Sequence, residues 1–258
     1  MAEEYPEYLY KFRSGSKRDI ENLRNGNIWL PKFEDMNDPH DGQLDILIDQ
    51  AIRMHGVHTP MVIHDASGSP AFIPFGLGTT EHENRHSPEV EEKYRKEAEK
   101  AKQFYGNVGV YSLSESCGSP QMWAHYASES SGFCIEYKLR TDSGDLHQNC
   151  EYFFRVRYVD DYPEVDLRLL SLSTEGRRLF EMFGRKERNW SYEKEWRFVS
   201  PEGGFPAPQP LPISSIIFGA KANDQLIDDI KAVFEGTDVL MKRSTKVPSQ
   251  FEFGTELL

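Results

Sequence analysis

Apolar and polar positions alternate along several short stretches of the chain, and each alternation predicts a β-strand. The expected strands cover residues 8–13, 27–30, 108–114, 132–137, 152–158, 193–199, 213–218 and 239–242. Caps, Glu–Lys pairs and apolar spacings of three and four residues predict helices at 17–24, 43–54, 88–105, 120–130, 166–188 and 223–234. Strands outnumber long helices and come in clusters, which indicates an α+β fold. The simplest organisation is one domain over residues 1–258 with a helical and irregular insertion at about 43–107.

The strand expected at 193–199 combines apolar and charged side chains. Alternation places Glu193, Glu195 and Arg197 on one face, opposite the aromatic side chains of Trp196 and Phe198. On its own, this face is equally well explained as an exposed surface with a local Glu–Arg pair, which contributes little stability. The alternative is a site in which two carboxylates and a guanidinium face a ligand.

Composition favours a cytoplasmic protein. The chain has no run of about 18 apolar residues, so we expect no membrane span. Its acidic start lacks a basic region followed by an apolar stretch, so we expect no secretory signal. The three cysteines form no CxxC pair, which argues against a disulfide framework or a zinc site.

The formal net charge of -12 disfavours broad electrostatic attraction to nucleic acid or anionic lipid. A local basic cluster remains, which we interpret as the solvated side of the helix expected at 166–188. Its members are Arg177, Arg178, Arg185, Lys186 and Arg188.

Three expected strands carry polar residues that would suit a single site. The first supplies Arg13, the middle one Ser112 and Ser114, and the late one Glu193 and Glu195. In this order the residues resemble the arginine, serine-x-serine and glutamate-x-glutamate pattern of the ADP-ribosyltransferase superfamily. The resemblance implies a split antiparallel or mixed β-sheet core with peripheral helices, and NAD as substrate.

The resemblance also implies a role for each residue. Arg13 would contact the NAD pyrophosphate, because a guanidinium makes bidentate contacts to phosphate. One serine hydroxyl would orient the key glutamate while the other touches the nicotinamide ribose. Glu195 would stabilise the positive charge that develops as the N-glycosidic bond breaks. Glu193 would orient or deprotonate the acceptor, which is a nucleic acid, a protein or water.

A second resemblance covers nearly the whole chain. Five separated motifs are similar to those of a widespread bacterial family that is catalogued only as a domain of unknown function. They are Leu9-Tyr-Lys-Phe-Arg13, Asn37-Asp-Pro-His-Asp41, Trp123-Ala-His-Tyr126, Gly132-Phe-Cys-Ile-Glu136 and Trp190-Ser-Tyr-Glu-Lys-Glu-Trp-Arg197.

The opening segment, residues 9–30, also resembles the start of the DarT-type DNA ADP-ribosyltransferases, although it lacks their histidine. This resemblance implies a phosphate-contacting role for Arg13, a catalytic role for Glu195, and a function in phage defence or a toxin–antitoxin system.

The loop before residue 43 gathers oxygen-bearing side chains and leaves an alternative open. Asn37, Asp38 and Asp41 are hard ligands of the kind that divalent cations prefer. Together, Asp38, Asp41 and Glu195 would suit a metal-dependent nuclease or phosphodiesterase. We favour a loop that hydrogen-bonds its own backbone, caps the next helix and shapes a ligand cleft, with no metal.

Two aromatic residues of the helix expected at 120–130 complete the candidate site. Trp123 and Tyr126 share one helix face and could stack on a base or on nicotinamide, although we favour core packing for them. With Tyr10, Arg13, Ser112 and Ser114, they form the expected NAD-binding set. A third hypothesis is a non-catalytic domain that senses a nucleotide or binds a protein partner in the same cleft.

Overall fold

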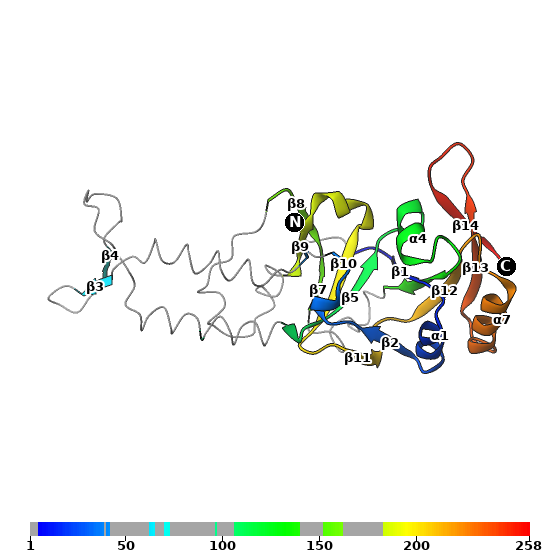
Figure 1. Ribbon diagram of the computed structural model, residues 1–258, viewed down its shortest axis with the longest axis horizontal. Helices are drawn as coiled ribbons and strands as arrows, with labels where there is room; N and C mark the ends of the chain where they lie inside the picture. Colours follow the sequence, from blue (N-terminus) through cyan, green and yellow to red (C-terminus); the bar gives the residue numbers. More distant parts are fainter. Residues whose placement is uncertain are drawn as a thin grey trace.

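The computed structural model describes residues 5–38, 40–41, 62–64, 70–72, 96, 106–139, 152–161 and 183–258. Within them, eight strands form one mixed sheet (Figure 1). Their spatial order is β14 (Phe253–Leu257), β13 (Leu240–Lys246), β12 (Ile213–Phe218), β6 (Phe133–Lys138), β1 (Tyr8–Arg13), β5 (Gly109–Ser114), β10 (Glu195–Ser200) and β7 (Tyr152–Arg155). All neighbours are antiparallel except β12 and β13. The predicted α+β class is confirmed.

Helices in the described residues begin at polar caps, as the sequence leads us to expect. Ser16 forms a capping box with Asp19 at α1 (Lys17–Arg24), and Ser119 and Asn223 cap α4 (Pro120–Tyr126) and α7 (Asp224–Val233). The 3₁₀ turns are η1 (Phe33–Asp35) and η3 (Arg188–Glu193). Three small pairings join β2 (Asn27–Leu30) to β11 (Phe205–Pro208), β3 (Val62–His64) to β4 (Pro70–Phe72), and β8 (Arg157–Val159) to β9 (Arg185–Glu187).

The two faces of the main sheet bury different helices (Figure 1). On one face, Trp123 of α4 is fully buried, and its ring lies edge-on to Phe12 of β1 at 5.1 Å. On the other face, Leu23 of α1 and Ile230 of α7 join the larger core, which also contains Tyr111 of β5. This burial of apolar side chains holds both layers to the sheet.

The sheet opens between β1 and β5. These strands pair only at Tyr10 and Ser114, whereas β1 pairs with β6 at six positions and β5 pairs with β10 at six. Beyond Tyr10, the Lys11 ammonium reaches across and donates a hydrogen bond to the Ser112 carbonyl at 2.7 Å. A gap therefore lies beside the strands that carry the predicted site residues.

Register also decides which of those residues share a face. Residues paired across neighbouring strands point to the same side of a sheet. Tyr10 pairs with Ser114 and Ser114 with Glu195, so the three form a row across β1, β5 and β10. Ser112 pairs with Arg197 in the next row of that face. Because side chains alternate along β1, Arg13 belongs to the opposite face.

Several predicted elements differ from the structure. The strand expected at 152–158 divides into β7 and β8, and the helix expected at 120–130 ends at Tyr126. The strand expected from residue 193 begins at Glu195, because η3 ends at Glu193 and Lys194 adopts a left-handed conformation with φ 46°. The helix expected over 166–188 is wrong at its described end, where β9 pairs with β8 and buries Lys186. The helices expected at 43–54 and 88–105 and the earlier part of 166–188 lie outside the described residues. In the described part of the chain, no helix has the length and apolar character needed to cross a membrane.

Candidate functional site

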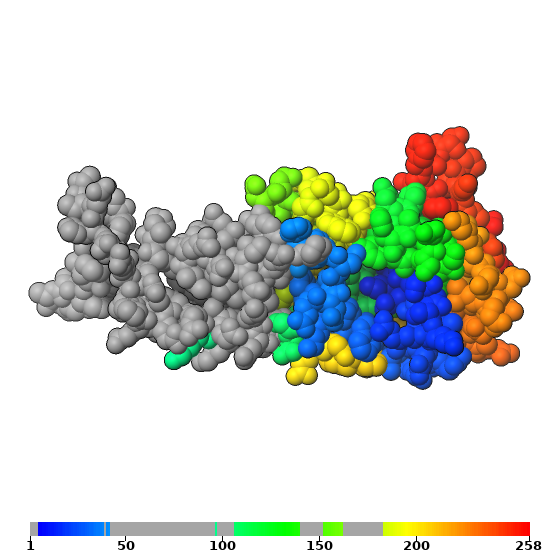
Figure 2. Space-filling model, viewed as in Figure 1, coloured from blue at the N-terminus to red at the C-terminus, as the bar shows by residue number. Residues whose placement is uncertain are grey.

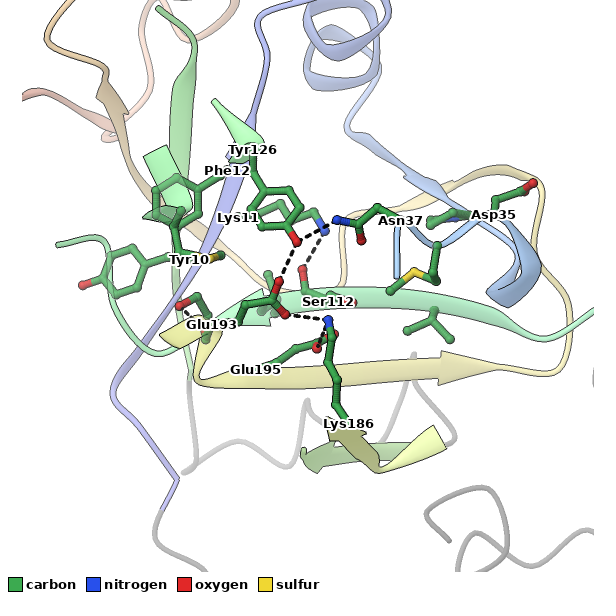
Figure 3. Close-up of a pocket in the computed structure, with 16 residues that line it drawn as sticks. Tyr10, Lys11, Phe12, Asp35, Asn37, Ser112, Tyr126, Lys186, Glu193 and Glu195 are labelled. Carbon is green, nitrogen blue, oxygen red and sulfur yellow. Dashed lines mark hydrogen bonds and ion pairs between the residues drawn. The ribbon is translucent and has the colours of Figure 1, made fainter. Parts of the chain in front are cut away.

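A cavity of about 240 Å³ lies where β1 and β5 diverge (Figure 3). Its walls come from β1, β5, β10, α4, β9 and the segment around η1, which are far apart in the sequence. Figure 2 shows segments of the first forty residues, in blue, next to the green of α4 on the viewed face. The predicted residues among those lining the cavity are Tyr10, Asn37, Ser112, Ser114, Tyr126, Glu193 and Glu195.

Two carboxylates meet at one wall of this cavity. Lys186 of β9 donates hydrogen bonds to Glu193 Oε2 at 2.7 Å and to Glu195 Oε2 at 3.3 Å. Glu193 and Glu195 are 4% and 2% exposed, so both charges are almost removed from water. The left-handed turn at Lys194 brings Glu193 to the same side as Glu195, although it does not belong to the strand.

Arg197 holds the Glu195 carboxylate and is itself bonded by Asp41. Arg197 is fully buried and donates from Nε to Glu195 Oε1 at 2.8 Å and from Nη2 to Oε2 at 3.1 Å. The same guanidinium bonds both carboxylate oxygens of Asp41 and the carbonyl of Phe183. This bidentate arrangement fixes the Glu195 carboxylate with its charge in place.

The surrounding charges give the two glutamates different pKa values. Burial alone would raise the pKa of Glu195, but the positive charges of Arg197 and Lys186 outweigh it and hold that pKa well below its usual range. Burial raises the pKa of Glu193, and the charge of Glu195 adds to the effect despite Lys186. Glu195 is therefore ionised at neutral pH, and Glu193 is the readier proton acceptor of the two.

The net charge of the buried cluster supports the same difference in pKa between Glu193 and Glu195. Asp41, Glu193 and Glu195 contribute three negative charges against the two positive charges of Lys186 and Arg197. A buried cluster with one excess negative charge favours uptake of a proton. Burial also raises the pKa of Asp41, against the charge of Arg197, but Glu193 is the carboxylate of the three that the guanidinium does not contact, so it takes up a proton most readily.

Neighbouring hydroxyls position the carboxylates. Tyr126 of α4 donates to Glu193 Oε1 at 2.5 Å and accepts from Asn37 Nδ2 at 2.9 Å. Ser114 Oγ donates to the Glu193 carbonyl at 2.6 Å and so fixes the turn that carries this glutamate. The hydroxyl of Ser112 is buried on the cavity wall and makes no hydrogen bond of ordinary geometry with a described residue.

Loss of the Tyr126 hydroxyl should shift the titration of Glu193. Its hydrogen bond lowers the pKa of Glu193, so Tyr126→Phe should raise that pKa further. If Glu193 acts as a base, the acid limb of the rate–pH profile moves to higher pH, and the rate at pH 7 falls roughly tenfold. Tyr5→Phe, which removes a hydroxyl from a 45% exposed ring, is the matched control. An unchanged profile would show that Tyr126 does not act through Glu193.

Some predicted residues lie away from the cavity walls. Arg13 is directed to the other face, where its guanidinium lies 5.5 Å from the Tyr111 ring centroid and 4.0 Å from Asp19. Trp123 belongs to the core and donates from Nε1 to the Cys117 carbonyl, so its face is not available for stacking. Asp38 is buried and accepts a hydrogen bond from the His40 backbone, as expected for a self-bonded loop.

The metal-dependent alternative finds little support in this geometry. Arg197 occupies the space between Asp41 and Glu195 with hydrogen bonds to both, and Lys186 lies within 3.7 Å of each. These cations already neutralise the oxygens that a metal would need. In the described ranges, no three His, Cys, Asp or Glu side chains are grouped as metal ligands.

Two lysines of the site were not predicted from the sequence. Lys186 lies in a charged stretch that is typical of a solvated helix, yet it is 4% exposed. Lys11 lies inside an aromatic-rich strand, and that position is the one available signal that its amine faces something other than water. Tyr158, whose oxygen accepts from the Glu195 backbone N–H at 2.8 Å, was also missed.

Comparison with known proteins covers the late part of this site. Residues 122–198 match a family of unknown function. The family model is described as "Protein of unknown function (DUF2971)". The matched stretch begins within α4 and ends within β10, so it includes Tyr126, Lys186, Glu193, Glu195 and Arg197. The predicted resemblance to a family of unknown function is confirmed over this stretch. No curated protein and no solved structure matches the chain, so the resemblance to DarT-type enzymes stays a prediction.

Proposed function

We propose that this protein cleaves the bond between nicotinamide and ribose in NAD and transfers ADP-ribose to a macromolecule or to water. The observation that carries the proposal is the pair Glu193 and Glu195, bridged by Lys186 at the wall of the cavity. Two carboxyls whose surroundings push their proton affinities apart are the usual basis for divided roles in catalysis.

Each glutamate has a distinct task in this proposal. Glu195, held ionised by Arg197, stabilises the positive charge that develops on the ribose as its C1′–N bond breaks and the electron pair leaves with nicotinamide. The acceptor oxygen then bonds to C1′, and Glu193 takes the proton that this oxygen loses. No charge is left uncompensated, because departing nicotinamide is neutral and Glu193 becomes neutral.

The geometry of the sheet supports an ADP-ribosyltransferase-like arrangement. The proposed reaction needs a cleft beside the two glutamates, and β1 and β5 pair only at Tyr10 and Ser114, the latter next to Glu195. Tyr126 lines the cavity and provides an aromatic ring for the ligand, whereas Trp123 is buried in the core.

The size of the cavity is consistent with binding one end of the ligand. Pockets that enclose a whole drug-sized ligand measure roughly 300–1,000 Å³. A cavity of about 240 Å³ therefore accommodates the reacting ribose and its neighbours, with the adenosine end outside.

Nicotinamide release tests this proposal. The wild-type protein should release nicotinamide from NAD, and Glu195→Gln should release it at least about a hundredfold more slowly. Glu202→Gln, an exposed glutamate beyond β10, is the control and should match wild type. Equal release by wild type and Glu195→Gln would remove Glu195 from its role. Saturable NAD binding without release would favour a sensor, and EDTA-sensitive cleavage of a phosphodiester would favour the metal-dependent alternative.

A further inference from the structure

Lys11 is a cation in the cavity wall without a carboxylate partner in the described structure. Its Nζ donates to the Ser112 carbonyl at 2.7 Å and lies 4.7 Å from the Tyr111 ring centroid. Across the described ranges, no carboxylate lies within ion-pair distance of this amine. Lys186, the other lysine of the cavity, is already bonded to Glu193 and Glu195.

The Ser112 hydroxyl is a second polar group that lines the same cavity as Lys11. Its Oγ is buried and makes no hydrogen bond of ordinary geometry with a described residue, although its interaction with Glu195 helps to lower the pKa of that carboxylate. A buried hydroxyl without a partner costs free energy, roughly 1–3 kcal/mol, unless a ligand or water completes it. In Figure 3, the Lys11 side chain of β1 reaches across the gap to the backbone carbonyl of Ser112 on β5.

We infer that Lys11 and Ser112 form an anion site that binds a phosphate of the ligand in the gap between β1 and β5. An ammonium without a counter-ion and a buried hydroxyl that makes no hydrogen bond of ordinary geometry are together complementary to a phosphate oxygen. The inference rests on the proposed function for the identity of that ligand, whose phosphates belong to the pyrophosphate of NAD. It transfers the phosphate contact expected of Arg13 to a lysine two residues earlier on the same strand.

The surroundings of Lys11 make this site sensitive to pH. Burial and the positive charge of Arg13 lower the pKa of Lys11 to about 7, against the opposing charges of the nearby carboxylates. The charged groups that face it are Arg13 on β1, Asp19 on α1, Glu193 in η3 and Glu195 on β10. Below pH 7 the amine is charged and attracts phosphate, and above pH 7 this attraction is progressively lost.

Binding of ADP-ribose, measured by calorimetry, separates this inference from catalysis. ADP-ribose carries the pyrophosphate but no bond to nicotinamide, and its phosphates stay ionised between pH 6 and 9. At pH 6.5, Lys11→Met should weaken its binding at least about tenfold and leave the binding of adenosine unchanged. Ser112→Ala should weaken it several-fold. Lys221→Met, at an exposed position, should match wild type.

A pH series with Lys11→Arg adds a test that does not depend on loss of packing. Wild-type affinity for ADP-ribose should fall from pH 6.5 to 8.5, whereas that of Lys11→Arg should stay flat, because a guanidinium keeps its charge. The inference is overturned if ADP-ribose does not bind, if Lys11→Met binds it as well as wild type does, or if only Arg13→Met weakens it. Binding that depends on Lys11 in a protein that releases no nicotinamide would retain the anion site and reject the proposed reaction.

Discussion

Replacing Glu193 by glutamine should reduce nicotinamide release from NAD by about 10²–10⁴-fold, the range typical of losing a general base. The amide keeps the size of the side chain but accepts a proton far less readily. Lys186 remains bonded to Glu195, and the buried cluster then carries two negative and two positive charges. The variant should therefore fold and still bind NAD.

The pH dependence gives this prediction a second readout. Because burial raises the pKa of Glu193, wild-type activity should fall with decreasing pH at values above the ordinary titration of a glutamate. The residual activity of Glu193→Gln should show no such limb. Glu202→Gln again provides the control. A variant with wild-type rate, or with the same acid limb, would show that Glu193 does not accept the proton.

Replacing Arg197 by methionine should lower the free energy of unfolding by about 3–5 kcal/mol, the loss typical of removing one partner from a buried ion pair. Arg197 is fully buried and bonds Glu195, Asp41 and the Phe183 carbonyl. Without it, two carboxylates and a carbonyl stay in the interior with Lys186 as their remaining cation. Methionine fills a similar volume, so the loss reports on charge and hydrogen bonding more than on a void.

A second arginine shows whether the loss of stability comes from burial of the ion pair or from any ion pair. Arg188 forms a close pair with Asp160, but the two side chains are 58% and 68% exposed. Arg188→Met should therefore leave stability almost unchanged, because water replaces the lost contact. Urea denaturation at pH 7 measures both variants. Similar small losses for the two would show that the buried cluster contributes little beyond an exposed pair.

Much of the fold is predictable because local rules and tertiary packing agree along most of the sheet. The strands β1, β2, β5, β6 and β12 lie within one residue of their predicted ranges. The edge pairings were missed for identifiable reasons. β11 contains two prolines, which are tolerated only because it pairs at an edge with β2. β14 was not predicted because it is defined by its pairing with β13, and β13 extends four residues beyond its predicted end.

Most residues of the site could be predicted from the sequence, but the face of the sheet to which each side chain points could not. Ser112, Ser114 and Glu195 converge because alternation and strand order place them together, and the left-handed turn at Lys194 adds Glu193. Alternation along β1 sends Lys11 and Arg13 away from the face of Glu195, but the Lys11 amine reaches the Ser112 carbonyl in the gap and lines the cavity, whereas Arg13 does not. Local sequence gives no register between β1 and β5, so it gives no indication that these strands diverge and let Lys11 reach the cavity.

A crystal structure of Glu193→Gln with NAD bound tests the central claim most directly. The variant should bind NAD without consuming it, with the nicotinamide ribose beside Glu195 and Tyr126 and the pyrophosphate on Lys11. Such a complex would place the reacting bond at the cavity between β1 and β5. NAD bound at another surface, with the cavity empty and the Lys186 to Glu195 contact undisturbed, would contradict the account.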